Sequence, residues 1–121
     1  MTIPHAAPGQ ILDLRPLGSE LRNARTAALL KTPQLEVIRL VLPAGKEIPA
    51  HRAPGAITVH CLEGRVAFTA LGKTQELSCG QLLYLPAGVE HAARGVEDAS
   101  VLVTLQLPDR TPAGSGAKTA S

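Results

Sequence analysis

Short segments with alternating apolar and polar positions make up the middle of this 121-residue chain. Each segment ends at a proline, a glycine or a small polar cluster, and none has the length or the 3.6-residue period of a long helix. Many short strands separated by such turn residues predict an antiparallel β-sandwich or barrel. Strands are expected at 27–31, 35–42, 56–62, 65–70, 74–77, 82–85 and 100–107.

The alternation is clearest on either side of Glu63 and Gly64. A two-residue turn at this point predicts a hairpin between 56–62 and 65–70. In that register the apolar positions of both strands share one face, which we expect to line the interior. The predicted pocket lining is Ile57, Val59, Cys61, Val66, Phe68 and Ala70. By the same alternation, His60 is expected to point outward.

The two ends of the chain differ from the middle. Residues 1–10 contain two prolines and a glycine and predict a flexible arm, while the small polar residues of 110–121 predict a disordered tail. Residues 19–25 are expected to form one or two helical turns capped by Ser19. The single β-barrel domain then spans residues 11–109.

Composition and charge exclude several classes of function. The net charge of +2 comes from basic residues spread along the chain, and Phe68 and Tyr84 are its only aromatic residues, so nucleic acid is not an expected partner. No signal-peptide pattern and no membrane-spanning apolar stretch is present, which predicts a cytoplasmic protein without a membrane partner. Cys61 and Cys79 lack CxxC spacing and are expected to be reduced thiols.

Two stretches that end on histidine carry the candidate chemistry. His51 follows Gly45 after five intervening residues, with Gly64 further on, and residues 80–91 read GQLLYLPAGVEH, ending on His91. These stretches resemble the two sequence motifs of the cupin superfamily. The resemblance implies an all-β, single-domain, RmlC-like jelly-roll barrel that forms a homodimer. It also implies that the two histidines meet at one end of the barrel.

The metal ligands that the resemblance implies are kept only in part. His51 and His91 match two of the family's four ligand positions. The other two positions hold apolar residues, because Ala53 stands where a second histidine is usual and Ile57 where a glutamate is usual. The asparagine sometimes found after the last histidine is Gly95 here. Transition metals held by proteins usually have three or four ligands, so two histidines alone predict weak binding.

A third ligand would come from His60 or Cys61. Strand alternation directs His60 outward and favours a surface or dimer-interface role, although a β-bulge would reverse its direction. Cys61 is expected to point inward, where its thiolate would be a suitable soft ligand. The implied cofactor is a divalent transition metal (Fe, Mn, Ni or Zn) or none.

The sequence leads to three hypotheses for function. The first is a small cupin barrel that binds a small molecule, a weakly held divalent metal, or both, in its interior. The alternative is a metal-dependent enzyme, a dioxygenase, isomerase or lyase, with His51 and His91 as metal ligands. The third is a structural or sensory module that acts through its dimer surface. Whether any reaction is catalysed stays open at this stage, because one fold supports many chemistries.

Overall fold

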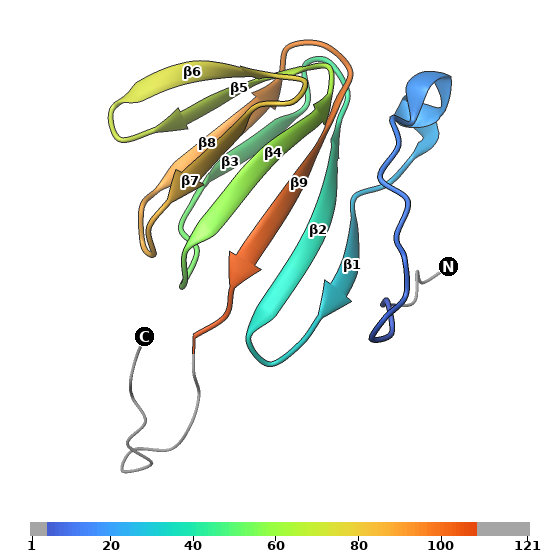
Figure 1. Cartoon of the computed structure of the whole chain (residues 1–121). Coiled ribbons are helices and arrows are strands. Elements are labelled where there is room, and N and C mark those ends of the chain that lie inside the picture. The colour runs from blue at the N-terminus through green and yellow to red at the C-terminus, as the bar shows by residue number, and fades with distance from the viewer. Residues whose placement is uncertain (1–4, 109–121) are drawn as a thin grey trace.

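A computed structural model describes residues 5–108, which form two antiparallel β-sheets with a shared apolar interior (Figure 1). One sheet has five strands in the order β1-β2-β9-β4-β7, and the other has four in the order β3-β8-β5-β6. The predicted all-β jelly roll with one short N-terminal helix is confirmed. The elements are η1 (Gly18–Asn23), β1 (Ala27–Lys31), β2 (Leu35–Leu42), β3 (Glu47–His51), β4 (Ile57–Glu63), β5 (Arg65–Ala70), β6 (Lys73–Ser78), β7 (Leu82–Leu85), β8 (His91–Gly95) and β9 (Ala99–Gln106).

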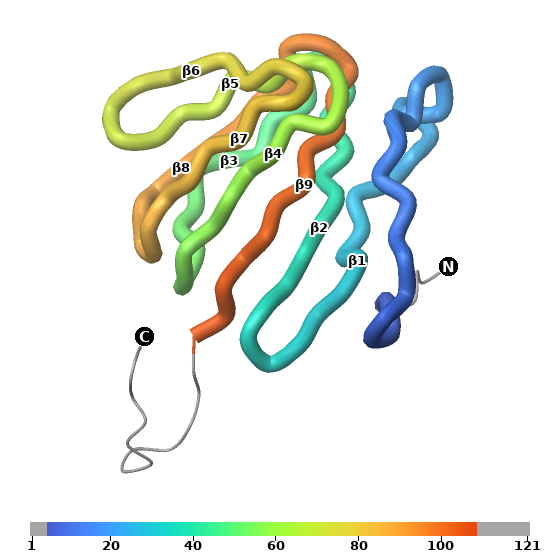
Figure 2. Tube along the Cα trace, in the orientation of Figure 1, coloured from blue at the N-terminus to red at the C-terminus, as the bar shows by residue number. Residues whose placement is uncertain are grey.

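The predicted hairpin between β4 and β5 is wrong, because these strands belong to different sheets. β4 pairs with β7 and β9, and β5 pairs with β6 and β8. Figure 2 follows the chain as it leaves β4, turns at the corner and enters β5. Gly64 makes this corner with a φ of +75°, and a Cβ at this position would lie 2.1 Å from the carbonyl oxygen of Asp98. Glycine is therefore needed there for both backbone conformation and space.

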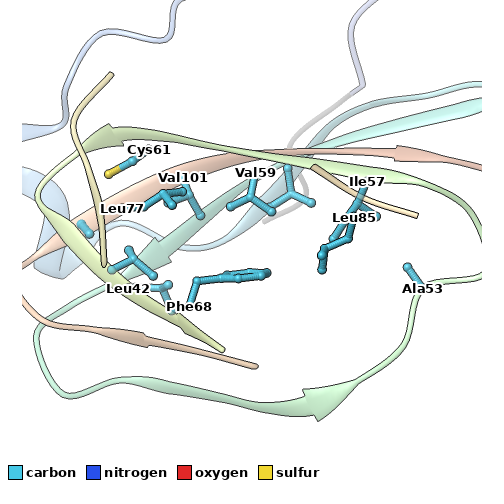
Figure 3. Close-up of a cluster of buried hydrophobic side chains, with 12 residues drawn as sticks. Leu42, Ala53, Ile57, Val59, Cys61, Phe68, Leu77, Leu85 and Val101 are labelled. Atoms are coloured by element: carbon cyan, nitrogen blue, oxygen red, sulfur yellow. The ribbon is translucent and has the colours of Figure 1, made fainter. Parts of the chain in front are cut away.

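The prediction of which side chains of β4 and β5 point inward remains correct for most of them. Val59 on β4 and Val66 on β5 are both buried in one core, because the two strands face the same interior from opposite sheets. Alternation along a strand defines which side chains point inward, and it does not depend on which strand is the hydrogen-bonded neighbour. The core also includes residues of β2 and β9, and Figure 3 shows Phe68 reaching toward its centre.

Most strand bounds agree with the sequence expectation, but β3 and β8 were not predicted. Strands β1, β2, β5 and β7 have the expected bounds, and β4, β6 and β9 differ by one residue at each end. β3 contains Pro49 and has no apolar alternation. It is an edge strand of its sheet, where a proline without an N–H group is tolerated. β8, with the sequence HAARG, is equally short and has no alternating apolar pattern.

The N-terminal segment packs against the five-stranded sheet. The short helix η1 is a 3₁₀ helix, and its cap position is Leu17, so the predicted cap by Ser19 is wrong. The side chain of Glu63 replaces it by accepting hydrogen bonds from the N–H groups of Leu17 and Gly18. Within the predicted arm, the N–H of Ala6 donates to the carbonyl oxygen of Leu29. The flexibility of the arm stays a prediction, and the predicted tail at 110–121 lies outside the described residues.

Candidate functional site: a histidine pair at an apolar cavity

His51 and His91 lie side by side at one end of the four-stranded sheet. They are cross-strand partners, His51 on β3 and His91 on β8. The pairing of these two strands is irregular along β3, between positions 48 and 51. Their ring centroids are 4.3 Å apart, with the ring planes at 61°. The two motifs therefore converge in space as predicted. We refer to His51 and His91 as the histidine pair.

The loop from β7 to β8 is joined to the segment that follows His51. Gly88, at a φ of +81°, donates its N–H to the carbonyl oxygen of Ala53 at 2.9 Å. Its own carbonyl oxygen accepts a hydrogen bond of 2.8 Å from Nη1 of Arg52. The positive φ accounts for the glycine at position 88, and the two bonds fix the turn against the segment after β3. The turn brings the chain back to β3, and His91 begins the strand that pairs with it.

Backbone hydrogen bonds set the orientation of both imidazoles. Nδ1 of His51 lies 3.1 Å from the carbonyl oxygen of Pro49, and Nδ1 of His91 lies 2.9 Å from that of Val89. A carbonyl oxygen only accepts hydrogen bonds, so Nδ1 carries the proton in each neutral ring. Nε2 is then the nitrogen with an available lone pair. Such hydrogen bonds from Nδ1 to the backbone are also typical of histidines that ligate metals.

The two histidines differ in their exposure. His51 is exposed, whereas His91 is only 7% exposed. The ring of His91 stacks on Phe68 with a centroid distance of 5.6 Å and an interplanar angle of 14°. His91 is therefore held between an aromatic side chain and its partner imidazole.

An apolar cavity of about 300 Å³ opens beside the histidine pair. Four of the predicted lining residues, Ile57, Val59, Val66 and Phe68, line it. The prediction missed the contribution of β2 and β9. The lining from these two strands is Ile38, Leu40, Leu42, Val101, Val103 and Leu105.

Cys61 and Ala70, the other two predicted lining residues, do not line this cavity. Cys61 lies deeper, near the corner at Gly64, where its thiol donates to the carbonyl oxygen of Glu63 at 3.4 Å. Figure 3 shows Cys61 at the opposite end of the core from Ala53. Burial raises the pKa of the Cys61 thiol, which disfavours the thiolate form that binds metal. Ala70 borders a shallow groove outside the cavity.

Among the residues that the structure describes, no third ligand lies beside the histidine pair. His60 is absent from the cavity lining and lies at the alternate position of β4, between Leu82 on β7 and Leu102 on β9. Within residues 5–108, no group of three or more His, Cys, Asp or Glu side chains could hold a metal ion. Ala53 and Ile57 contribute only apolar wall to the cavity. The donor set of two imidazoles does not fit a tightly held transition metal.

Arg52, which the sequence places next to His51 and which would be expected to be an ordinary surface arginine, is a polar neighbour of the cavity. Its side chain lines both the cavity and the adjoining groove. The guanidinium bonds to the carbonyl oxygen of Gly88 and lies 3.9 Å from a carboxylate oxygen of Glu90. Both side chains of this ion pair are more than half exposed, so their attraction is weak. Proximity to His51 in the chain is the one sequence signal for this residue.

Two antiparallel sheets around an open apolar cavity, with a polar spot at one end, define a jelly-roll barrel with an interior site. A family model described as a cupin domain matches residues 38–105, more than half of the chain, and the chain belongs to this family. The expected superfamily is thereby confirmed. A search of the curated proteins finds no match. Among the described residues, no helix is long and apolar enough to cross a membrane.

Solved structures with the same fold span nearly the whole chain. A conserved protein of unknown function from Streptococcus pyogenes is 26% identical, with a TM-score of 0.70, over 89% of this chain and 96% of that one. A cupin superfamily protein from Desulfitobacterium hafniense is 16% identical, with a TM-score of 0.67, over 82% and 100% of the two chains. An RmlC-like cupin from Methanocaldococcus jannaschii is 17% identical, with a TM-score of 0.67, over 82% and 94%.

Proposed function

We propose that the protein binds a small, mostly apolar molecule in the cavity between its two sheets. The observation that carries this proposal is the apolar cavity of about 300 Å³ with the histidine pair at its edge. Small-molecule sites in proteins are typically apolar concavities with a few polar groups that orient the ligand. The shallow groove that Ala70 borders and the concavity around Arg15 and Glu20 do not combine such a lining with two imidazoles.

Ligand titration with a cavity-filling variant tests the proposal. In nuclear magnetic resonance titrations with a library of small apolar compounds, we expect bound compounds to shift the signals of Val59, Phe68 and Val103. Ala93 lines the cavity from β8, so Ala93→Leu should reduce the affinity of each compound at least tenfold. Ala92→Leu is the matched control, because Ala92 is the neighbouring residue and does not line the cavity. Equal affinities for the two variants would contradict the proposal.

The histidine pair also supports weak binding of a divalent metal (Fe, Mn, Ni or Zn). The alternative function, a metal-dependent dioxygenase, isomerase or lyase, is favoured by the lone pair that Nε2 of each neutral imidazole keeps, but it needs a further donor. That donor would have to come from a ligand or from outside residues 5–108. We expect purified protein to lose its metal on dialysis. Stoichiometric metal that survives dialysis and disappears in the double variant His51→Ala, His91→Ala would favour the enzyme.

Assembly and location complete the proposal. We expect a homodimer, in which a second copy covers the outer face of β7, where Leu82 and Tyr84 are each 62% exposed. Sedimentation velocity at micromolar concentration tests this, with Tyr84→Lys as the variant expected to dissociate the dimer. A wild-type protein that sediments as a monomer would exclude this assembly.

The third hypothesis, a structural or sensory module, would act through the same dimer surface. A cytoplasmic location stays a prediction from the sequence.

A further inference from the structure

We propose that the cavity selects uncharged molecules that carry a hydroxyl group, a phenol or an alcohol, and that this hydroxyl donates a hydrogen bond to Nε2 of His91. This inference rests on the proposed function, since it names the chemical class of the molecule in the cavity. It follows from three observations: Nε2 of His91 has no hydrogen-bond donor among the described residues, the cavity wall is mostly apolar, and the cavity has room for a small carbon frame.

The nitrogen is Nε2 of His91, a residue that is buried as a whole. This side chain lies in the cavity wall with 7% of its surface exposed. Its Nδ1–H is used by the carbonyl oxygen of Val89, and no group within residues 5–108 donates a hydrogen bond to Nε2. Buried polar atoms in folded proteins are almost always hydrogen-bonded, and the exceptions call for a missing partner. A neutral imidazole in this tautomer offers a lone pair at Nε2, so the missing partner is a donor.

The wall cannot supply that donor. Apart from the histidine pair, Thr26 and Arg52, the lining is made of apolar side chains. The hydroxyl of Thr26 accepts a hydrogen bond of 2.9 Å from the N–H of Val41 and makes none with His91. The guanidinium of Arg52 is directed to the carbonyl oxygen of Gly88. A ligand must therefore bring its own donor to His91.

Arg52 would favour an anion only weakly. Its side chain is 65% exposed, and the carboxylate of Glu90 at 3.9 Å offsets part of its charge. An anionic ligand would also place its charge next to an imidazole nitrogen that presents a lone pair. A neutral O–H group matches that lone pair directly, and its oxygen keeps two lone pairs that can face the exposed mouth.

The volume of the cavity sets the size of the carbon frame. An enclosed apolar cavity of about 150 Å³ holds one benzene ring. The cavity here is about twice that volume, so a frame of two fused rings is a suitable probe. Phe68 lines the cavity and stacks on His91, and its ring offers an aromatic face to such a frame.

Four naphthalene compounds with one frame and different polar groups test the inference. They are 2-naphthol, which donates and accepts hydrogen bonds, 2-methoxynaphthalene, which only accepts, 2-naphthoate, which is anionic, and naphthalene, which has no polar group. Isothermal titration calorimetry of the full-length protein at neutral pH measures each affinity. We expect 2-naphthol to bind at least tenfold more tightly than 2-methoxynaphthalene, and more tightly than 2-naphthoate.

The variant His91→Phe tests the assignment to one nitrogen. Phenylalanine keeps a ring to stack on Phe68 but has no acceptor. The advantage of 2-naphthol over 2-methoxynaphthalene should fall to less than twofold, while 2-methoxynaphthalene binds as it does to the wild type. His51→Phe, the matched control at the exposed partner, should keep most of the advantage. Circular dichroism and thermal unfolding establish that both variants are folded, and the comparison of ligands on the wild type does not depend on either.

The possible outcomes test different parts of the proposal. Equal affinity for all four compounds would overturn the hydroxyl inference and leave the proposed binding function standing. Tighter binding of 2-naphthoate than of 2-naphthol would also overturn it, in favour of anion recognition. An advantage for 2-naphthol that persists in His91→Phe would remove His91 from the inference. Failure of all four compounds to bind would overturn both the inference and the proposed apolar binding function.

Discussion

Removing the carboxylate of Glu63 should destabilise the fold strongly, because this side chain joins the N-terminal segment to the five-stranded sheet. It accepts hydrogen bonds from the N–H groups of Leu17 and Gly18 and from the hydroxyl of Ser100, the last at 2.6 Å. Nη2 of Arg39 lies 3.3 Å from the same carboxylate. The side chains of Arg39 and Glu63 are only 10% and 13% exposed. The cluster is therefore largely removed from water.

The expected size of the effect follows from this burial. Breaking a buried ion pair by removing one partner typically costs about 3–5 kcal/mol, since the remaining charge has no counterion. Glu63→Ala would leave the guanidinium of Arg39 in this position and would also leave two backbone N–H groups without their acceptor. We therefore expect the free energy of unfolding to fall by about 3–5 kcal/mol. The double variant Arg39→Met, Glu63→Leu should recover part of this loss, because no buried charge remains.

Urea denaturation followed by circular dichroism measures the loss. The matched control is Glu97→Ala, which removes an exposed ion pair with Arg65 and should leave the free energy of unfolding nearly unchanged. A loss for Glu63→Ala as small as that of the control would refute the reasoning. It would mean that water reaches the Arg39–Glu63 cluster readily, or that the N-terminal segment contributes little to the stability of the barrel.

The same carboxylate predicts how stability depends on pH. Burial raises the pKa of Glu63, but the hydrogen bonds from Leu17, Ser100 and Gly18 and the charge of Arg39 outweigh it and lower the pKa overall. A lowered pKa in the folded state contributes stability that is fully present above the ordinary Glu value of about 4.3 and is lost as the pH falls through the lowered value. Glu63→Gln should therefore be closer to the wild type in stability at acidic pH than at pH 7. A constant difference across this range would contradict the assignment.

Three further predictions concern other residues. Cys79 is exposed and should react with a maleimide in the folded protein, whereas Cys61, which is buried with a raised pKa, should react only after unfolding, as intact-mass measurement would reveal. Gly64→Ala should cost clearly more stability in urea than Gly72→Ala, because both glycines have a positive φ of +75° and +79° but only Gly64 has backbone within 3 Å of an added Cβ. The left-handed backbone alone costs on the order of 1–3 kcal/mol in each variant, so equal losses would argue against the close contact. Ala53→His should add a third imidazole beside the histidine pair and raise the affinity for Co²⁺ at least tenfold in calorimetry, and an unchanged affinity would show that position 53 cannot reach the pair.

Structural features that depend on the local pattern of residues could be predicted from the sequence. Features that depend on contacts between residues far apart in the chain could not. Alternation was sufficient for the inward direction of Val59 and Val66, because it reports only which side of a strand is buried. The same alternation fits a hairpin and a crossing between sheets equally well, so the pairing of β4 with β5 was predicted wrongly. The cap of η1 comes from Glu63, more than forty residues further along the chain, and no local signal indicates it.

The same distinction between local and distant features applies to the candidate site. The resemblance to the cupin motifs implied that His51 and His91 meet, and their rings do lie together. The third ligand was left between His60 and Cys61, and neither lines the cavity, because one lies outside the barrel wall and the other beyond the cavity at the corner. The walls contributed by β2 and β9 required the three-dimensional pairing of the two strands.

The apolar residues at the two missing ligand positions and the unpartnered nitrogen of His91 have a common cause. Ala53 and Ile57 are apolar and only 7% and 3% exposed, so at these two positions the wall offers no side-chain oxygen or nitrogen to complete a metal site. The same apolar wall provides no donor to Nε2 of His91 among the described residues. A divalent metal and a ligand hydroxyl would then compete for one lone pair, so added Zn²⁺ should weaken the binding of 2-naphthol. If Zn²⁺ and 2-naphthol bind without affecting each other, the hydroxyl and the metal do not share this nitrogen, and the two uses of the site must be assigned to different atoms.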